Sequence, residues 1–482
     1  MVIGATQLAV VGGGPGGYAA AFLAADLGVQ VTLIDHEPNP GGVCLYRGCI
    51  PSKALLHVAK VLSEARHAAQ WGVTFAAPDI DLEQLRRWKE RVVGQLTGGL
   101  GELCKRRQVT FLQGRASFLD ANTLSIQKTD GEEAPLRFEH AIVATGSRPV
   151  ALPGMYIDSP RVWNSTTALE LREVPRSLLV IGGGYIGLEL GTVYAALGSQ
   201  VTVVEMTEGL LPGVDRDLVS IVSKALGQCF EAVMLKTKVI AMQEESQGIR
   251  VTLEGPEGES ASQVFDQVLI AVGRVPNSSG LGLNTTRVQI DGRGFIVVDS
   301  QRCTAEATIY AIGDVAGEPM LAHKATHEGR VAAEAIAGHK TAFEPRAIPA
   351  VVFTDPEIAW CGLTETQVRR EQRRVEVVRF PWAASGRALS MDRPDGLTKL
   401  VIDAETERLL GVGIVGSGAG ELIAEGVVAM EMGALATDVK LSIHPHPTLS
   451  ETLMEAAEVF FGQSTHLYRP LRRSHARSGN SA

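Results

Sequence analysis

Residues 8–22 read LAVVGGGPGGYAAAF, a short apolar run followed by a glycine cluster and an alanine-rich stretch. Residues 178–192 read LLVIGGGYIGLELGT and repeat the same order. Each copy then reaches a β-branched run that ends in an acid, 18 residues after the last glycine of its cluster. The two copies are offset by 170 residues throughout. The sequence therefore predicts a duplicated unit of strand, glycine turn, helix and strand.

A glycine cluster between a strand and a helix is typical of dinucleotide binding. The first glycine permits a tight turn, the second lets a pyrophosphate approach the backbone, and the third lets the helix pack against the sheet. The helix N-terminus offers N–H groups to the phosphates, and the acid accepts hydrogen bonds from ribose hydroxyls. The predicted cofactor-binding residues are Gly12, Gly14, Gly17 and Asp35 in the first copy, and Gly182, Gly184, Gly187 and Glu205 in the second.

The residues after the second acid distinguish between the two pyridine nucleotides. Met206 and Thr207 follow Glu205, and no Arg stands there to bind a 2′-phosphate. The second site is therefore predicted to favour NAD over NADP.

Each half closes with a related strand and turn, AIVATGSRP at 141–149 and VLIAVGRVP at 268–276. These turns add Gly146 and Gly273 to the candidate cofactor-binding residues. A further apolar strand, TIYAIGDV at 308–315, ends near Asp314, which is suited to bond a ribose or ribitol hydroxyl. Without that context, Asp314 would be interpreted as an ordinary turn residue.

Composition sets broad limits. A chain of 482 residues suggests about three domains. The net charge of −9 argues against nucleic acid as a partner. The sequence contains no run of 18 apolar residues, so no membrane span is predicted. The first ten residues lead straight into a strand and lack the basic segment of a signal peptide, so we expect a cytoplasmic protein.

The stretch GGVCLYRGCIPSK at 41–53 contains the cysteines with a predicted redox role, Cys44 and Cys49. On a regular helix, residues five apart differ by about 140° and about 7.5 Å of rise, which suits a disulfide poorly. Gly48 and the glycines before Cys44 predict an irregular turn that brings the sulfurs together. Pro51 suits a helix's first turn, so Cys49 would lie near an N-terminus that favours thiolate. Two chance cysteines are the alternative, which their place after the first nucleotide unit makes weaker.

The other cysteines lie far apart in the sequence. We expect reduced, partly buried thiols at Cys104, Cys229, Cys303 and Cys361. Two helices are predicted within 55–107, and alternating apolar residues at 375–380 and 398–402 predict an antiparallel sheet. Further helices are predicted at 421–432 and 449–461.

The segment HPHPTLSE at 444–451 contains a candidate acid/base. His446 lies between two prolines, and an imidazole suits removal of a thiol proton at neutral pH. Glu451 has two possible roles. It either bonds the other imidazole nitrogen and fixes its tautomer, or it completes a capping box that begins at Thr448.

Several of these segments resemble the dihydrolipoamide dehydrogenases, within the class I pyridine nucleotide-disulfide oxidoreductases. The similar segments include GGVCLYRGCIPSKALLH at 41–57, GGGYIGLELGTVYAALGSQVTVVE at 182–205, YAIGDV at 310–315, MLAHKA at 320–325, FPWAASGRAL at 380–389 and HPHPTLSE at 444–451. The resemblance extends to about residue 464. It implies an α/β fold with two Rossmann-like FAD/NAD(P)-binding domains and a C-terminal α+β dimerisation domain.

The resemblance also implies boundaries, cofactors and partners. The FAD-binding domain is expected at 1–149 and, for its second part, at 273–345, with the NAD-binding domain at 150–272. The dimerisation domain is expected at 346–464 and a flexible basic tail at 465–482. FAD would occupy the first site and NAD the second, in a homodimer. The partners would be lipoyl domains of 2-oxo acid dehydrogenase acyltransferases, or the glycine-cleavage lipoyl protein.

The family's residue roles are transferred by position. Cys44 would exchange with substrate through a redox disulfide with Cys49, which would face the flavin. Lys53 would lie near the flavin N5 and pair with Glu189. The remaining implied site residues are Ala116 and Ala322 at the flavin, Tyr185 over the nicotinamide site, and His446 with Glu451, both supplied by the partner subunit.

The chain departs from the commonest family pattern at Tyr46 and Arg47, between the cysteines, and at Pro445. Three alternatives are disfavoured. A glutathione reductase needs basic residues after Glu205, and a mercuric reductase needs an extra cysteine pair near the C-terminus. A flavoprotein scaffold without turnover would not need Cys44, Cys49 and His446 together.

Overall fold

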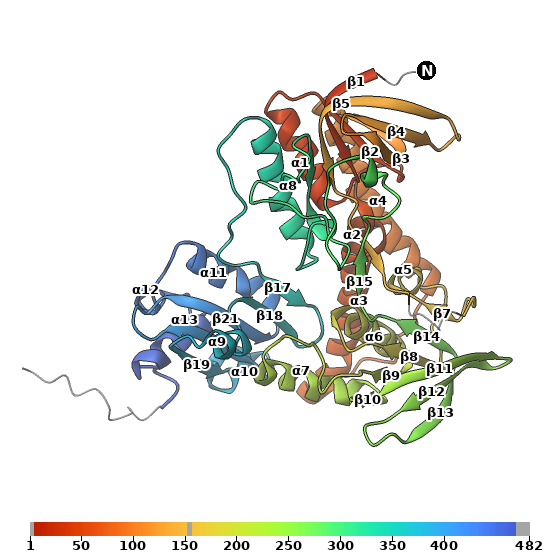
Figure 1. The fold of residues 1–482 in the computed structure, drawn as a ribbon. Helices are drawn as coiled ribbons and strands as arrows, with labels where there is room; N and C mark the ends of the chain where they lie inside the picture. Colours follow the sequence, from red (N-terminus) through yellow and green to blue (C-terminus); the bar gives the residue numbers. More distant parts are fainter. Residues whose placement is uncertain (1–3, 152–156, 469–482) are drawn as a thin grey trace, which may run out of the picture. The chain divides into compact units, whose positions relative to one another are not determined.

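The computed structural model describes residues 4–151 and 157–468. Two compact units emerge, and each is described by itself (Figure 1). The first unit comprises the described residues of Met1–Gly209 and Phe230–Glu344. The second comprises those of Leu210–Cys229 and Pro345–Ala482. The predicted α/β fold class is confirmed.

The first sheet of the first unit is mainly parallel. Its strands follow the order β3 (Thr110–Asp120), β2 (Val31–Asp35), β1 (Gly4–Val11), β5 (Glu133–Val143) and β16 (Ile309–Ala311), with β4 (Thr123–Lys128) antiparallel to β3 and β5. Leu8 and Val10 of β1 face one hydrophobic cluster, and Ala9 and Val11 face another. Both faces of the sheet are therefore buried, as a parallel sheet requires.

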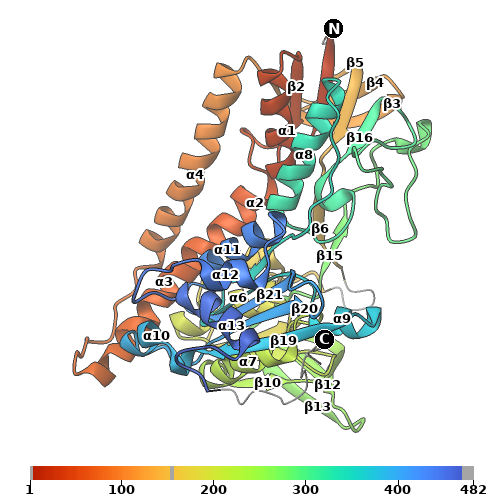
Figure 2. The same ribbon diagram turned by 90° about the vertical axis from the view of Figure 1, so that its left-hand side faces the viewer.

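Helices α1 (Pro15–Asp26) and α8 (Ala322–Ile336) lie side by side on one face of this sheet (Figure 2). They approach closely because glycines face each other. A Cβ at Gly329 would lie 2.5 Å from the carbonyl oxygen of Gly16. The contact fixes α8, whose first residue is Ala322, against the helix that follows the first glycine turn.

The second sheet of this unit is fully parallel. Its order is β10 (Ala232–Met234), β9 (Gln200–Val204), β8 (Ser177–Ile181), β14 (Gln267–Ile270) and β7 (Val162–Trp163). Leu8 pairs with Val31 in the first sheet, and Leu178 pairs with Val201 in the second. The predicted duplication is thus confirmed down to strand register, because both pairs keep the offset of 170 residues.

Smaller elements complete the first unit. The two helices predicted within 55–107 are α3 (Cys49–His67) and α4 (Leu82–Arg106), preceded by α2 (Gly42–Arg47). Helix α3 packs against α6 (Tyr185–Leu197). The other elements are α5 (Ser165–Leu169), an antiparallel sheet of β11 (Lys238–Glu245), β12 (Gly248–Glu254) and β13 (Ser260–Phe265), and the pair β6 (Ser147–Pro149) and β15 (Arg274–Pro276).

The second unit contains the predicted antiparallel sheet. Its order is β17 (Ala350–Val352), β18 (Glu357–Gly362), β21 (Leu409–Gly416), β20 (Leu397–Asp403) and β19 (Val375–Pro381). The predicted C-terminal helices are α11 (Ala419–Glu431) and α13 (Glu451–Phe461), with α12 (Ala436–Leu441) between them. Trp382 and Phe380 are among the largest fully buried side chains of its core.

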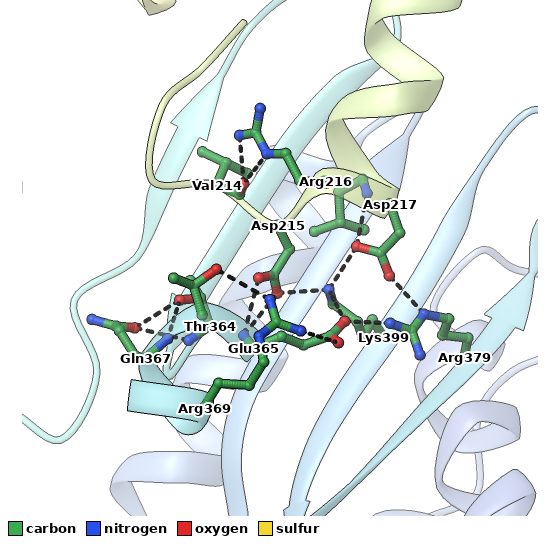
Figure 3. Close-up of polar contacts among 12 residues, drawn as sticks. Val214, Asp215, Arg216, Asp217, Thr364, Glu365, Gln367, Arg369, Arg379 and Lys399 are labelled. Atoms are coloured by element: carbon green, nitrogen blue, oxygen red, sulfur yellow. Dashed lines mark hydrogen bonds and ion pairs between the residues drawn. The ribbon is translucent and has the colours of Figure 1, made fainter. Parts of the chain in front are cut away.

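Helix α7 (Arg216–Cys229) belongs to this second unit, although the sequence placed it within the nucleotide-binding stretch 150–272. Figure 3 shows the physical reason. Lys399 of β20 is 1% exposed, and its Nζ lies 2.6 Å from Asp215, 2.7 Å from Asp217 and 3.0 Å from Glu365. Arg379 of β19 also contacts Asp217 and Glu365. These ion pairs hold the start of α7 against the sheet.

Two further expectations differ from the structure. Cys229, expected to be partly buried, is exposed at the end of α7, whereas Cys104 and Cys361 are buried. The residues 465–468, expected in a flexible tail, are described, and Leu467 packs against the core of the second unit. Residues Arg469, Arg472, Arg473 and Arg477 of that tail lie outside the described residues. Among helices of the described parts, none is both long and apolar enough to cross a membrane.

Candidate active site

The two glycine turns have the same geometry. Gly12 has φ +107°, and a Cβ there would lie 2.3 Å from the carbonyl oxygen of Ala144. A Cβ at Gly17 would lie 1.8 Å from the carbonyl oxygen of Gly12. Around Gly14, in contrast, no described heavy atom would lie within 4 Å of a Cβ. The first and third glycines are therefore required by packing, and the second faces open space where a ligand can approach.

The second copy repeats this pattern. Gly182 has φ +109°, and a Cβ there would lie 2.5 Å from the carbonyl oxygen of Ala271. A Cβ at Gly187 would lie 2.3 Å from the carbonyl oxygen of Gly182, whereas Gly184 faces open space. No side chain of the described residues caps α1 or α6 at its N-terminus. Their first N–H groups are therefore free to bind phosphate.

The acids that end β2 and follow β9 hold the glycine turns. Asp35 accepts hydrogen bonds from the backbone N–H groups of Gly13 and Glu37. Glu205 accepts them from Gly183 at 2.7 Å and Thr207 at 2.8 Å. The sequence predicted only a ribose contact for these acids. Each carboxylate has about four acceptor sites, so holding the turn leaves capacity for ribose hydroxyls.

A cavity of about 640 Å³ opens at the first glycine turn. This is the size of a cofactor site, and it brings together twelve of the predicted residues. They are Gly12, Gly14, Asp35, Cys44, Cys49, Lys53, Ala116, Gly146, Tyr185, Glu189, Asp314 and Ala322. The lining does not include Gly17, Gly182, Gly184, Gly187, Glu205 or Gly273. The open space at Gly14, the uncapped α1 and the acid at Asp35 suit a dinucleotide such as FAD.

The two cysteines meet at a break between helices. Helix α2 ends at Arg47, Gly48 adopts φ −142° and ψ −112°, and α3 begins at Cys49. A Cβ at Gly48 would lie 2.9 Å from the carbonyl oxygen of Val43, so glycine permits the close turn. The break brings the sulfurs into hydrogen-bond contact, which a continuous helix would not.

Both cysteines are free thiols in the structure, and their acidities differ. The hydrogen bond from Cys44, followed by the positive charge of Lys53, lowers the pKa of Cys49 to about 7, against the opposing effect of burial. The same hydrogen bond and burial raise the pKa of Cys44 well above its ordinary value. Of the pair, Cys49 therefore carries the thiolate and Cys44 the proton.

Lys53 connects the thiols to the second half of the duplication. Its Nζ lies 2.7 Å from Oε2 of Glu189 in α6, and the Glu189 side chain is 4% exposed. The family's expected contact between these two residues is thus present. Lys53 lies one helical turn after Cys49, so its positive charge stabilises the Cys49 thiolate, and Lys53 also lines the cavity.

Two departures from the family pattern, Tyr46 and Arg47, lie between the cysteines, and Arg47 lines the cavity. The Arg47 guanidinium forms an ion pair with Glu37, and it lies 3.5 Å from Nε2 of His36. The Tyr46 hydroxyl donates to the carbonyl oxygen of Asn39 at 3.2 Å. Both side chains thus bind the segment after β2. Tyr185 is 41% exposed, yet atoms that crowd its hydroxyl raise its pKa to about 12.

Sequence reasoning missed the groups that hold Asp314. This residue lies in a 3₁₀ turn, Gly313–Val315, past the end of β16. Its carboxylate accepts from the Ser147 hydroxyl, which in turn accepts from Nε of Arg274 at 2.7 Å. The Gly313 N–H donates to Glu328 at 2.7 Å. Ser147 and Arg274 lie in the closing turns AIVATGSRP and VLIAVGRVP, but neither residue was itself a candidate in the sequence.

The candidate acid/base lies in the second unit. Nδ1 of His446 lies 2.9 Å from Oε1 of Glu451, and Oε2 of Glu451 accepts from the Thr448 N–H at 2.8 Å. Burial opposes ionisation of Glu451, but the Thr448 and His446 contacts outweigh it and lower its pKa. Helix α13 begins at Glu451 itself, so the predicted capping box is present only in part. The His446 side chain is 72% exposed and can meet a substrate.

Comparisons with known proteins identify the family. The pyridine nucleotide-disulphide oxidoreductase family matches residues 6–329, and the dimerisation domain of the same family matches residues 348–457. Together the matches span most of the chain. Their border lies close to the border between the two units at residues 344 and 345.

Individual relatives agree with this assignment. The chain is 50% identical to the dihydrolipoyl dehydrogenase of Haemophilus influenzae over 96% of each chain. It is 50% identical to that of Vibrio parahaemolyticus over 96% of this chain and 97% of the relative.

Two solved structures are similar across 94% of this chain and 99% of their own. LpdA from Mycobacterium tuberculosis superposes with a TM-score of 0.87 at 27% identity. The flavoprotein disulfide reductase RclA from Escherichia coli superposes with a TM-score of 0.84 at 28% identity. The chain belongs to the pyridine nucleotide-disulphide oxidoreductase family.

Proposed function

We propose that this chain is a dihydrolipoyl dehydrogenase that oxidises a protein-bound dihydrolipoyl group with NAD⁺ and uses FAD. The observation that carries the proposal is the pair Cys44 and Cys49, with opposite pKa shifts, in the wall of a cavity that suits a dinucleotide. The relatives at 50% identity have this activity in their names.

The cofactors are assigned to the two glycine turns. Gly12, Gly14, Gly17 and Asp35 would hold FAD, together with Lys53, Ala116, Gly146, Asp314 and Ala322. When bound, FAD carries an electron pair from the dithiol to the pyridine nucleotide. Gly182, Gly184, Gly187 and Glu205 would hold NAD, with Gly273 in the closing turn and Tyr185 over the nicotinamide. We assign FAD and NAD to the domains with the boundaries expected from the sequence, except that residues 210–229 pack with the C-terminal unit.

The acidities of the cysteines suit a directional exchange. In the oxidised protein, Cys44 and Cys49 share a disulfide, and a substrate thiolate attacks Cys44. The bond between the cysteines breaks, and Cys49 leaves as a thiolate, which its low pKa favours. The second substrate thiol then attacks the mixed disulfide and releases its proton. Lipoyl disulfide forms, and Cys44 leaves and takes a proton, as its raised pKa favours.

His446 would remove the proton from the attacking substrate thiol. Glu451 holds Nδ1, which fixes the tautomer and leaves Nε2 as the nitrogen that accepts the proton. In the homodimer that we propose, His446 and Glu451 serve the cysteines of the partner subunit. The dimerisation domain matched at 348–457 supports a dimer. Lipoyl domains of 2-oxo acid dehydrogenase complexes, or of glycine cleavage, are the proposed partners in the cytoplasm.

The test is NADH formation by the purified holoprotein from dihydrolipoamide and NAD⁺. We expect turnover with NAD⁺ and much weaker turnover with NADP⁺, because Met206 and Thr207 provide no cation for a 2′-phosphate. Cys44→Ser and Cys49→Ser should each abolish turnover, and Cys229→Ser, at an exposed cysteine of the second unit, serves as the matched control.

Two results would contradict the proposal. NADPH-driven reduction of glutathione disulfide, without NADH formation from dihydrolipoamide, would indicate a glutathione reductase. Bound FAD without turnover of either substrate would indicate a scaffold protein.

A further inference from the structure

Helix α13, which begins with Glu451, carries two more acids at helical spacing. Glu455 and Glu458 follow at positions i+4 and i+7, so the three carboxyl groups share one stripe of the helix. Burial, and next to it the charge of Glu455, raises the pKa of Glu458. The stripe therefore concentrates negative charge beside the contact of Glu451 with His446.

The middle acid has its own histidine. The Glu455 side chain is 5% exposed, and its Oε1 forms a short ion pair with Nδ1 of His466. Its Oε2 accepts from the Ser464 hydroxyl at 2.6 Å. Leu467 packs against the core of the second unit and fixes the backbone beside His466. Successive turns of α13 thus carry two carboxylate–imidazole pairs.

Other charged groups lie near the two pairs, and one of them is Glu425 of α11, whose Oε1 lies 2.7 Å from Nε2 of His444. The hydrogen bond to Glu455, followed by the charges of Glu455, Glu451 and Glu458, raises the pKa of His466, which favours the imidazolium. On α12, Lys440 contacts the Phe461 ring and Gln463.

Two strands also pack on α13. Strand β19 bears Glu376 on the face that carries Val378 and Phe380. Strand β20 meets α13 through Thr398, which bonds Thr452.

We propose that His466 is a positioning residue for His446, because its pairing with Glu455 offsets a carboxylate charge that would otherwise act on the His446 imidazole in addition to that of Glu451. The inference rests on the proposed function only in taking His446 as the base. Neither His466 nor Glu455 belongs to a sequence motif described above.

The physical reason is the charge that an unpaired Glu455 would add. Its carboxylate lies one helical turn from Glu451, a rise of about 5.4–6 Å. An extra negative charge there stabilises the imidazolium and raises the pKa of His446. A base with a raised pKa is protonated at neutral pH over a wider range and removes substrate protons less often. At the dielectric of a protein surface, the expected shift is on the order of half a pH unit.

The experiment measures the pKa of His446 by NMR titration of the full-length holoprotein with ¹³C-labelled histidine. The resonance is assigned by its loss in His446→Gln. In His466→Gln the pKa of His446 should rise by about half a unit. The double variant His466→Gln, Glu455→Gln removes both charges and should return the wild-type value, and His466→Lys should retain it. His339→Gln, an exposed histidine of the first unit, is the control.

Two results would overturn the inference. One is a His446 pKa that is unchanged in His466→Gln. The other is a His446 pKa that shifts as far in the double variant as in His466→Gln. Both variants lack the contact between His466 and Glu455, but only His466→Gln leaves the Glu455 charge unpaired. The acid limb of the pH profile for NADH formation should move with the titration. If the wild type forms no NADH, the proposed function fails, but the titration still decides the role of the pair.

Discussion

Replacement of Lys399 by Met should destabilise the second unit strongly. The Lys399 Nζ has three carboxylate partners within 3.0 Å, those of Asp215, Asp217 and Glu365, and the side chain is 1% exposed. Met keeps most of the apolar stem and removes the charge. Removing one partner of a buried ion pair costs about 3–5 kcal/mol, because a remaining charge stays buried without compensation. Arg379 still pairs with Asp217 and Glu365, so the charge that loses its ion pair is that of Asp215, whose side chain is 8% exposed. For a unit of this size, that cost corresponds to a fall in Tm on the order of 10 °C.

The assay is thermal unfolding by calorimetry at pH 7 and at pH 5. Burial opposes ionisation of Asp217, but Lys399 and Arg379 outweigh it and hold its pKa below the ordinary value. In the wild type this stabilisation is present above the unfolded pKa and is lost as the pH falls through the folded pKa. In Lys399→Met the carboxylates that lose the Lys399 charge can be neutralised by protonation. The deficit relative to wild type should therefore be smaller at pH 5 than at pH 7.

Lys224→Met is the matched control on α7. Lys224 lies 3.7 Å from Asp395, but both side chains are at least 70% exposed. Such a surface pair contributes about 0–1 kcal/mol, so the control should barely move Tm. If Lys399→Met lowers Tm no more than the control, or by the same amount at both pH values, the buried ion pairs do not hold α7.

Three further outcomes are expected. Gly17→Ala should abolish FAD retention on purification, whereas Gly187→Ala should weaken NADH binding in titrations and spare FAD, because each Cβ would meet the carbonyl of its own turn. Lys53→Met should raise the pKa of Cys49 above about 7, seen as a thiolate absorbance that appears at higher pH in the reduced protein. Glu451→Gln should lower turnover about 10²- to 10⁴-fold and leave NADH binding unchanged, measured by steady-state kinetics.

The parts of the fold that repeat were predictable from the sequence. The glycine turns recur at a fixed offset, and the structure keeps that offset in strand register and in the backbone bonds to Asp35 and Glu205. The break between α2 and α3 was also predictable from Gly48. A continuous helix would have separated the two sulfurs, and a glycine between the cysteines indicated an irregular turn. These features are local, so a short window of residues determines them.

Features that depend on distant residues were not predictable. The apolar pattern of 216–229 marks a helix but does not say which core it faces, and Lys399 lies far along the chain. Ser147 bonds Asp314, and Arg274 bonds Ser147, from other segments of the chain. His466 lies in a stretch that the sequence analysis interpreted as a flexible tail. The polar composition of this stretch does not reveal that one of its side chains pairs with a buried carboxylate, that of Glu455.

Glu451 shows why two interpretations of one residue can be compatible. From the sequence, capping the helix and orienting His446 were alternative roles for Glu451, because each role was assumed to occupy the whole side chain. A carboxylate has two oxygens, and the structure uses Oε2 for the Thr448 N–H and Oε1 for His446. The backbone contact fixes the carboxylate before any substrate arrives, so the imidazole meets a preorganised acceptor. The capping contact therefore supports the orienting role. A variant that loses the hydrogen bond from the Thr448 N–H to Glu451 should also hold the His446 imidazole less firmly.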